Sequence, residues 1–193
     1  VHVLLASGNV GVQAATNEVL EQTELPMMLY VYATILALVF LTYRDWRAMI
    51  ACCLPLTLGT FLGYWFMKEL DIGLTVATLP VMVLAVGIGV DYAFYIYNRL
   101  QLYLAQGVDI VSAFKQALME TGIATIFTAI TLSIGVATWS FSALKFQAAM
   151  GLLLTFMFLV NMVMAITFLP ALAVVIDLLV PRRRPVRAPS LVH

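Results

Sequence analysis

Five apolar runs, separated by short polar stretches, dominate this sequence and restrict what it can fold into. Each run has about 20 residues, enough for an α-helix to cross a hydrocarbon layer of about 30 Å. A segment inside a bilayer must pair its own backbone polar groups, which a helix does. Hydrophobic residues make up 63% of the chain and charged residues only 10%, whereas soluble domains carry about 25% charged residues. We therefore expect an all-α integral membrane protein with transmembrane helices at about 26–43, 48–67, 74–97, 122–140 and 148–176.

A further helix is expected outside the hydrocarbon layer, over residues 107–121. Val111, Phe114 and Leu118 recur there at helical spacing, while the charged residues fall on other faces. This pattern is typical of an amphipathic helix that lies at the membrane interface. The fold prediction is thus five transmembrane helices plus one cytoplasmic interfacial helix.

The segments that flank the predicted membrane domain, residues 26–179, differ in character. Residues 1–25 are mixed and are interpreted as the end of a periplasmic segment, while residues 180–193 form a basic tail. Pro26 suits the first turn of the first span. Loops on the cytoplasmic side of membrane proteins carry an excess of Lys and Arg. With five spans, one side of the membrane receives most of the basic residues, namely Arg44, Arg47, Arg99, Lys115, Arg182, Arg183, Arg184 and Arg187. Only Lys68 and Lys145 fall on the other side, so we expect a cytoplasmic C-terminus and a periplasmic N-terminal segment.

Asp91 is the one acidic or basic residue that lies well inside an apolar run. It precedes Arg99 by eight residues, which places it about 12 Å from the cytoplasmic end of its helix. A carboxylate at such a depth is costly unless it is paired, hydrated or protonated, and it marks a functional site by default. Gly87 and Gly89 remove side chains just before the acid, so that a neighbouring helix can pack closely or water can enter.

Hydroxyl groups are expected at the depth of Asp91. Thr125, Thr128 and Thr131 lie on one stripe of the helix at 122–140 and reach a similar depth. Hydroxyls can hydrogen-bond a carboxyl group in either protonation state. Tyr92 adds a hydroxyl that is turned by about 100° from Asp91, toward another helix. We therefore predict a proton relay made of Asp91, Tyr92, Thr128 and Thr131, with Gly87 and Gly89 providing helix packing beside it.

Structural interpretations of the same residues remain open. Asp91 can instead be a structural acid bonded to a neighbouring helix, and the threonine stripe can be ordinary packing between helices. Asn161 is predicted to form an interhelical hydrogen bond but to lie too far outward to meet Asp91.

Other chemistries find little support in the sequence. Cys52 and Cys53 are adjacent, which disfavours a disulfide, and they lack metal-ligand spacing. The histidines, His2 and His193, stand at the two ends of the chain. An intramembrane aspartyl protease would need a second acid facing Asp91. We therefore expect no catalytic residues, no metal, no cofactor and no nucleic-acid partner.

The motif GIGVDYAFYIYNRL, the run ETGIATIFTAITLSIG and the closing FQAAMGLLLTFMFLVNMVMAITFLPAL resemble the RND superfamily of proton-driven exporters, in its MMPL-like branch. The resemblance implies the last five helices of the second half of such a transporter, a multi-pass protein of the bacterial inner membrane. It implies that Asp91 and Tyr92 pair with the same dipeptide in an N-terminal half that this chain lacks. It further implies proton-motive-force-driven export of lipids or other hydrophobic or amphiphilic molecules.

Two alternatives stay within the same fold. One is an accessory membrane subunit of protein translocation, although such subunits usually have Ala-Asn after the Asp, where this chain has Tyr92 and Ala93. The other is a lipid-sensing module that does not transport. The expected partners are the lipid bilayer, the N-terminal half and a lipid-like substrate; association into a homo-oligomer is left open.

Overall fold

The described part of the protein, residues 9–72 and 78–180 of a computed structural model, is built from helices joined by short turns. The α-helices are α1 (Asn9–Tyr43), α2 (Trp46–Glu69), α3 (Thr78–Ala105), α4 (Ile110–Ala117), α5 (Ile123–Ala137), α6 (Lys145–Val163) and α7 (Leu169–Leu179). Five stretches are long and apolar enough to cross a membrane: Leu25–Tyr43, Trp46–Glu69, Pro80–Ala105, Ile110–Phe141 and Lys145–Leu179. The prediction of an all-α membrane protein with five spans is confirmed.

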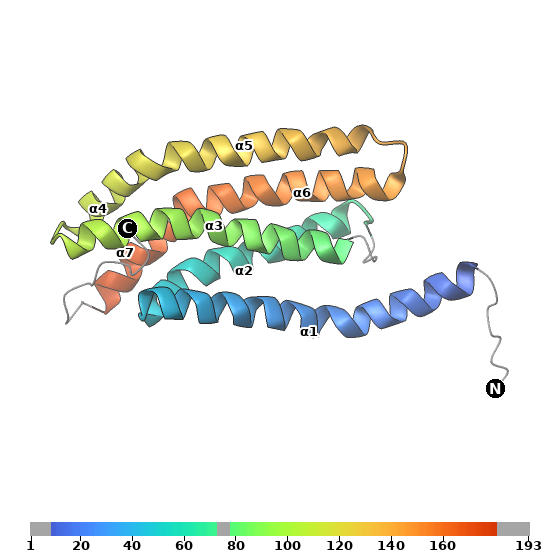
Figure 1. The fold of residues 1–193 in the computed structure, drawn as a ribbon, viewed down its shortest axis with the longest axis horizontal. Coiled ribbons are helices and arrows are strands. Elements are labelled where there is room, and N and C mark those ends of the chain that lie inside the picture. Colours follow the sequence, from blue (N-terminus) through green and yellow to red (C-terminus); the bar gives the residue numbers. More distant parts are fainter. Residues whose placement is uncertain (1–8, 73–77, 181–193) are drawn as a thin grey trace.

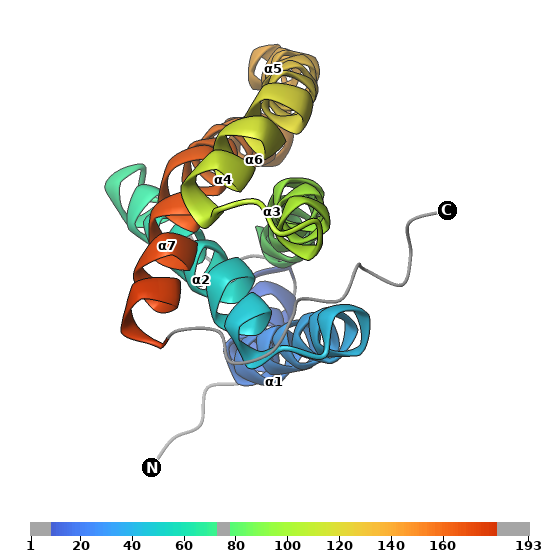
Figure 2. The same cartoon turned by 90° about the vertical axis from the view of Figure 1, so that its left-hand side faces the viewer.

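The helices stand side by side in a bundle (Figure 1). Viewed from one end, α2, α3 and α6 form its centre, with α1 on one side and α5 on the opposite side (Figure 2). Apolar side chains fill the contacts between the central helices; Met82, Met157 and Phe158 are buried at one such contact. Phe66 of α2 and Phe156 of α6 stack with their ring centroids 3.9 Å apart. This core fixes the orientation of α3, which carries Asp91.

The first candidate span, Leu25–Tyr43, begins one residue before the predicted boundary, so Pro26 stands in the first turn of the span. The helix that carries this span is longer, because α1 begins at Asn9 and continues through Pro26. A proline inside a helix removes one backbone hydrogen bond. The helix can continue from Asn9 across Pro26, because only one bond is lost. The predicted span boundary thus lies inside a longer helix.

The helix predicted over 107–121 begins at Ile110 and runs into α5 without an interruption. A positive φ of 83° at Gly107 reverses the chain after α3, and the Asp109 side chain accepts a hydrogen bond from the Val111 amide as an N-cap. Phe114 is buried in the core cluster that contains α3 residues. A π-helical turn, Leu118–Gly122, joins α4 to α5. The apolar face of α4 that carries Phe114 therefore packs on the protein core.

A second π-helical turn, Met164–Phe168, separates α6 from α7. Pro170 stands in the first turn of α7, where it has no N–H to give to the helix before it. The chain bends between α6 and α7, as Figure 1 shows.

One end of the bundle gathers the α1–α2 turn, the end of α3, α4 and the end of α7 (Figure 1). Two ion pairs join elements there: Arg47 with Asp177 (3.4 Å) and Arg99 with Glu120 (3.5 Å). Tyr103 also donates a hydrogen bond to Glu120. The basic tail predicted over 180–193 falls almost entirely outside the described residues, as do residues 1–8 and 73–77.

Candidate proton-relay site

Asp91 lies on an exposed face of α3. Leu84, Gly87 and Tyr95 share this face, and Leu84 and Tyr95 are 51% and 61% exposed. Among the described residues, no hydrogen bond or ion pair reaches the Asp91 carboxylate. The interpretation of Asp91 as a structural acid bonded to a neighbouring helix therefore finds no partner in this part of the chain. The carboxylate is free to interact with water or with another protein surface.

Tyr92 points in a different direction from Asp91. Its side chain is 2% exposed and belongs to the core cluster formed by the central helices. The predicted rotation by about 100° between neighbouring residues of a helix explains why one side chain faces outward and the next inward. The Tyr92 hydroxyl is buried and has no hydrogen-bond partner among the described residues. An unpaired buried hydroxyl costs about 1–3 kcal/mol, so a partner from water or another protein would be favourable.

The two glycines before Asp91 have different environments. A Cβ atom at Gly89 would lie 2.6 Å from Asn161 Nδ2 and 2.7 Å from a methyl carbon of Leu56. A Cβ atom at Gly87 would have no atom within 4 Å outside its own helix. Gly89 thus allows α2, α3 and α6 to approach closely, whereas Gly87 leaves open space on the face of Asp91.

Asn161 is the polar residue that the sequence analysis placed wrongly. Its side chain is 3% exposed, and Nδ2 donates a 2.8 Å hydrogen bond to the carbonyl oxygen of Ala85, so the predicted interhelical bond exists. However, Asn161 packs against Gly89, only two residues from Asp91. Two residues rise about 3 Å along a helix, so the two polar groups lie at similar depth. They do not meet because they lie on opposite sides of α3, not because Asn161 is too far outward.

The depth of Asn161 was misjudged because the π-turn after it was not predicted. An asparagine inside a 19-residue apolar helix was a visible signal, since polar side chains in spans usually bond across helices.

Thr128 and Thr131 are exposed on α5. The Thr131 hydroxyl donates to the carbonyl oxygen of Phe127 in its own helix, 2.7 Å away. α5 packs on α6, and α6 packs on α3, so α6 separates the threonine stripe from α3 along most of its length (Figure 2). Thr125 is buried and bonds to the carbonyl of Thr121. The structure does not join either predicted threonine to Asp91 by a hydrogen bond, and their part in a relay stays a prediction.

Within residues 9–72 and 78–180, no three His, Cys, Asp or Glu side chains come close enough to hold a metal ion. The chemical capacity of the site is therefore that of a single carboxyl group next to a buried phenol.

Comparison with known proteins identifies the family. The model of the MMPL family matches residues 6–189, which is nearly the whole chain. The chain belongs to the MMPL family. Its resemblance to the MMPL-like branch of the RND superfamily is confirmed by this match.

A relative of this MMPL protein is found in Methanocaldococcus jannaschii and is named as a membrane protein, MJ1562. It is 29% identical over 141 residues, which are 73% of this chain and 36% of the relative. The chain thus aligns with about a third of the length of this relative. No solved structure matches the chain.

Proposed function

We propose that this MMPL protein is part of a secondary transporter that uses the proton motive force to export lipids or other hydrophobic or amphiphilic molecules. The observation that carries the proposal is the position of Asp91, a carboxyl group in the middle of α3 with no partner in the described chain. The family membership supports it. No enzymatic reaction is part of the proposal.

The proposed mechanism follows from the cost of a charge in the membrane. While the Asp91 face is hydrated, the carboxyl group can ionise; when the face is covered, the neutral form is favoured because an ionised group would lose its water. Binding a proton from one side and releasing it to the other therefore couples proton flow to the covering and uncovering of this face. One proton that crosses about 100 mV supplies about 2.3 kcal/mol.

We assign the covering partner to an N-terminal half of the same transporter. The exposed face that carries Asp91 needs a polar or hydrated surface, because lipid tails cannot hydrogen-bond a carboxylate. The unpaired hydroxyl of Tyr92 is the second group of the proposed relay. A second copy of this chain is the alternative partner, and it would present the same face.

We also propose that the protein lies in the inner membrane of a bacterial cell with its C-terminus in the cytoplasm. The α1–α2 turn, the end of α3 and α4 occupy one end of the bundle, and their sequences contain Arg44, Arg47, Arg99 and Lys115. The positive-inside rule supports assigning this end to the cytoplasm.

The test compares three variants of the native polypeptide that contains this chain. Vesicles that contain it are loaded with a fluorescent phospholipid analogue, and its export is followed after a proton gradient is imposed. We expect Asp91→Asn to reduce gradient-driven export to the level of protein-free vesicles, because the asparagine amide does not bind a proton at physiological pH. Asp91→Glu should retain part of the export.

Glu120→Gln is the matched control, since it removes the same charge at the end of the bundle and should leave export intact. If Asp91→Asn exports at the wild-type rate and responds equally to the gradient, proton coupling through Asp91 is wrong. Thermal unfolding of all variants in detergent checks that each one is folded.

A further inference from the structure

The buried hydrophobic residues of the bundle form two clusters, which follow each other along the central helices. On α3 the boundary between the clusters falls between Ala85 and Val86, and on α2 it falls between Leu56 and Met67. Among the described residues, Ile88 is the one partly buried side chain that packs against both clusters. The core is therefore divided at one level of the bundle.

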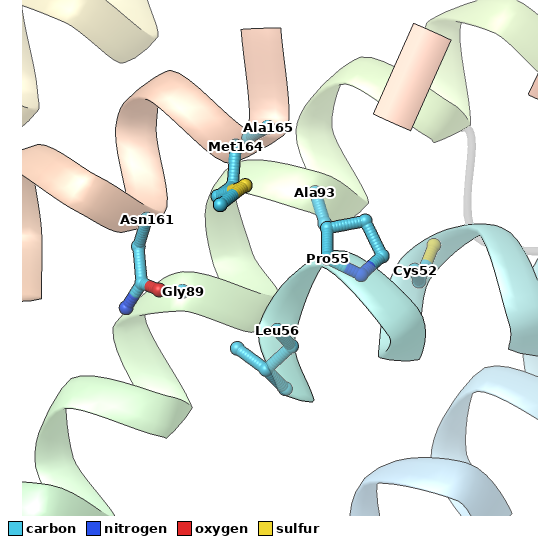
Figure 3. A pocket seen from close by; sticks show the side chains of 8 residues that line it. All are labelled: Cys52, Pro55, Leu56, Gly89, Ala93, Asn161, Met164 and Ala165. Carbon is cyan, nitrogen blue, oxygen red and sulfur yellow. The ribbon is translucent and has the colours of Figure 1, made fainter. Parts of the chain in front are cut away.

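Asn161 of α6 lies at this level, because Phe158 belongs to one cluster and Ala165 to the other. Its amide group fills the spaces that two glycines leave on the neighbouring helices. Oδ1 lies 2.5 Å from the position that a Cβ atom would take at Gly59 of α2, and Nδ2 lies 2.6 Å from that position at Gly89 of α3. Figure 3 shows the amide beside Gly89. One polar side chain thus separates the two clusters and contacts all three central helices.

The amide of Asn161 also holds one turn of α3. Nδ2 donates a 2.8 Å hydrogen bond to the carbonyl oxygen of Ala85, which in an α-helix is the acceptor for the backbone amide of Gly89. Gly87 belongs to the same turn, and glycine weakens a helix interior relative to other residues except proline. The turn that precedes Asp91 is therefore weak in itself and is held in place from α6.

The other two central helices are weakened at the same level. Pro55 lies inside α2, one turn before Gly59, and removes a backbone hydrogen bond there. The π-helical turn Met164–Phe168 begins three residues after Asn161. Sharp bends in helices occur mostly at prolines, at glycine or serine pairs and at π-turns. A cavity of about 10 Å³ also lies at this level, lined by Cys52, Pro55, Leu56, Gly89, Ala93, Asn161, Met164 and Ala165 (Figure 3).

We propose that this level is a pivot at which the two parts of the bundle bend against each other, and that Asn161 is a positioning residue for Asp91. Asp91 lies two residues beyond Gly89, so a bend at the pivot turns it relative to the part of α3 that ends at Ala85. The hydrogen bond from Asn161 to Ala85 holds the present orientation. This inference rests on the proposed function, because the bend supplies the movement that covers and uncovers Asp91.

The first test measures the bend of α3 by pulsed electron paramagnetic resonance. Nitroxide labels are attached to Leu84→Cys and Gln106→Cys, which are exposed on the two sides of the pivot, in a background with Cys52 and Cys53 replaced by alanine. The labels are about 33 Å apart along the helix. We expect Asn161→Leu to broaden the distribution of distances between the labels, because leucine cannot donate the hydrogen bond that holds α3.

Tyr32→Phe is the matched control for this measurement. It removes another 2.8 Å hydrogen bond between helices, which joins α1 to Thr60 of α2 and does not hold α3. The distribution in Tyr32→Phe should equal that of the wild type. A wild-type distribution in Asn161→Leu, or equal broadening in both variants, would overturn the pivot.

Two glycines of α2 test the pivot without a change at Asn161, and they decide the question if Asn161→Leu does not fold. Gly59→Ala places a methyl group against Oδ1 of Asn161 and should also broaden the distribution. The methyl group of Gly63→Ala would meet the sulfur of Met157, whose flexible side chain can move aside, so this variant should resemble the wild type. Thermal unfolding in detergent checks that each variant is folded. Equal distributions in the two glycine variants would contradict the pivot.

The second test measures gradient-driven export of the fluorescent phospholipid analogue. Asn161→Leu should lower the maximal rate several-fold and leave the half-saturating concentration of the analogue unchanged, because it misorients the relay. Tyr32→Phe should export at the wild-type rate. If Asp91→Asn abolishes export and Asn161→Leu exports at the wild-type rate, the positioning role is wrong and the proposed relay stands. The distance measurement needs no export, so it tests the pivot even where the relay through Asp91 fails.

Discussion

At the scale of single residues, α3 shows how residues that are close in sequence have different surroundings. Gly87 and Gly89 are both glycines one turn or less before Asp91, yet Gly89 contacts two helices and Gly87 faces open space. Asp91 and Tyr92 are consecutive, yet one is exposed and the other buried. The helical rotation of about 100° per residue produces both contrasts.

The first prediction concerns these two glycines. Gly89→Ala should destabilise the folded protein by about 1–3 kcal/mol, because its methyl group would overlap Asn161 and Leu56 and force them to move. Gly87→Ala is the matched control on the same helix, and it should cost nothing because nothing lies within 4 Å of its new methyl group. Thermal unfolding of the purified chain in detergent measures both. Equal losses for the two variants would contradict the assignment of Gly89 to the three-helix contact.

At the scale of helices, the sequence predicts which segments form membrane helices better than it predicts where each helix begins and how it joins the next. Hydropathy located the five spans, because a run of about 20 apolar residues has few alternatives to a membrane helix. Hydropathy did not reveal that α1 runs through Pro26, or that α4 joins α5 through a π-turn. Those features depend on which backbone hydrogen bonds are lost or shifted in the packed structure. The periodicity of apolar residues carries no information about this. The same gap explains the misjudged depth of Asn161, which lies just before the second π-turn.

The second prediction tests the π-turn between α4 and α5. A π-turn contains one residue more than an α-helix needs, so deletion of Met119, which is 68% exposed, should convert it to a regular helix. The wider turn already holds this extra residue, so its removal leaves α4 and α5 nearly in phase and Phe114 in its buried position. The deletion variant should therefore melt near the wild-type temperature. Insertion of one alanine after Met119 gives the turn a second extra residue, rotates α4 by about 100° relative to α5 and takes Phe114 out of the core, at a cost of about 2–3 kcal/mol. Equal losses for the deletion and the insertion would contradict the role of the π-turn in holding one extra residue.

At the scale of the whole molecule, the candidate site lies at the edge of the described chain and not at its centre. The three central helices pack their small and apolar residues against each other, and the face of α3 with Asp91 stays outside that contact. Sequence reasoning identified Asp91 because a lone acid in an apolar run is conspicuous. It could not tell which helices would cover the acid, since the neighbours of a helix are decided by packing. Thr128 and Thr131 were therefore placed beside Asp91 on depth alone.

The third prediction concerns how the molecule sits in the membrane. Gln106 follows α3 at one end of the bundle, and Ala143 lies between η2 (Thr138–Phe141) and α6 at the other end; both are exposed. Gln106→Cys and Ala143→Cys, each in a background with Cys52 and Cys53 replaced by alanine, present single thiols at opposite ends. A membrane-impermeant maleimide applied to intact cells should label the Ala143→Cys variant, whereas the Gln106→Cys thiol should react only after the membrane is opened. The reverse pattern would place the basic end of the bundle outside the cell. Protons that enter down the gradient would then reach Asp91 from that end, across about 12 Å of helix. Labelling of both thiols from outside would contradict the single span, Ile110–Phe141, that lies between them.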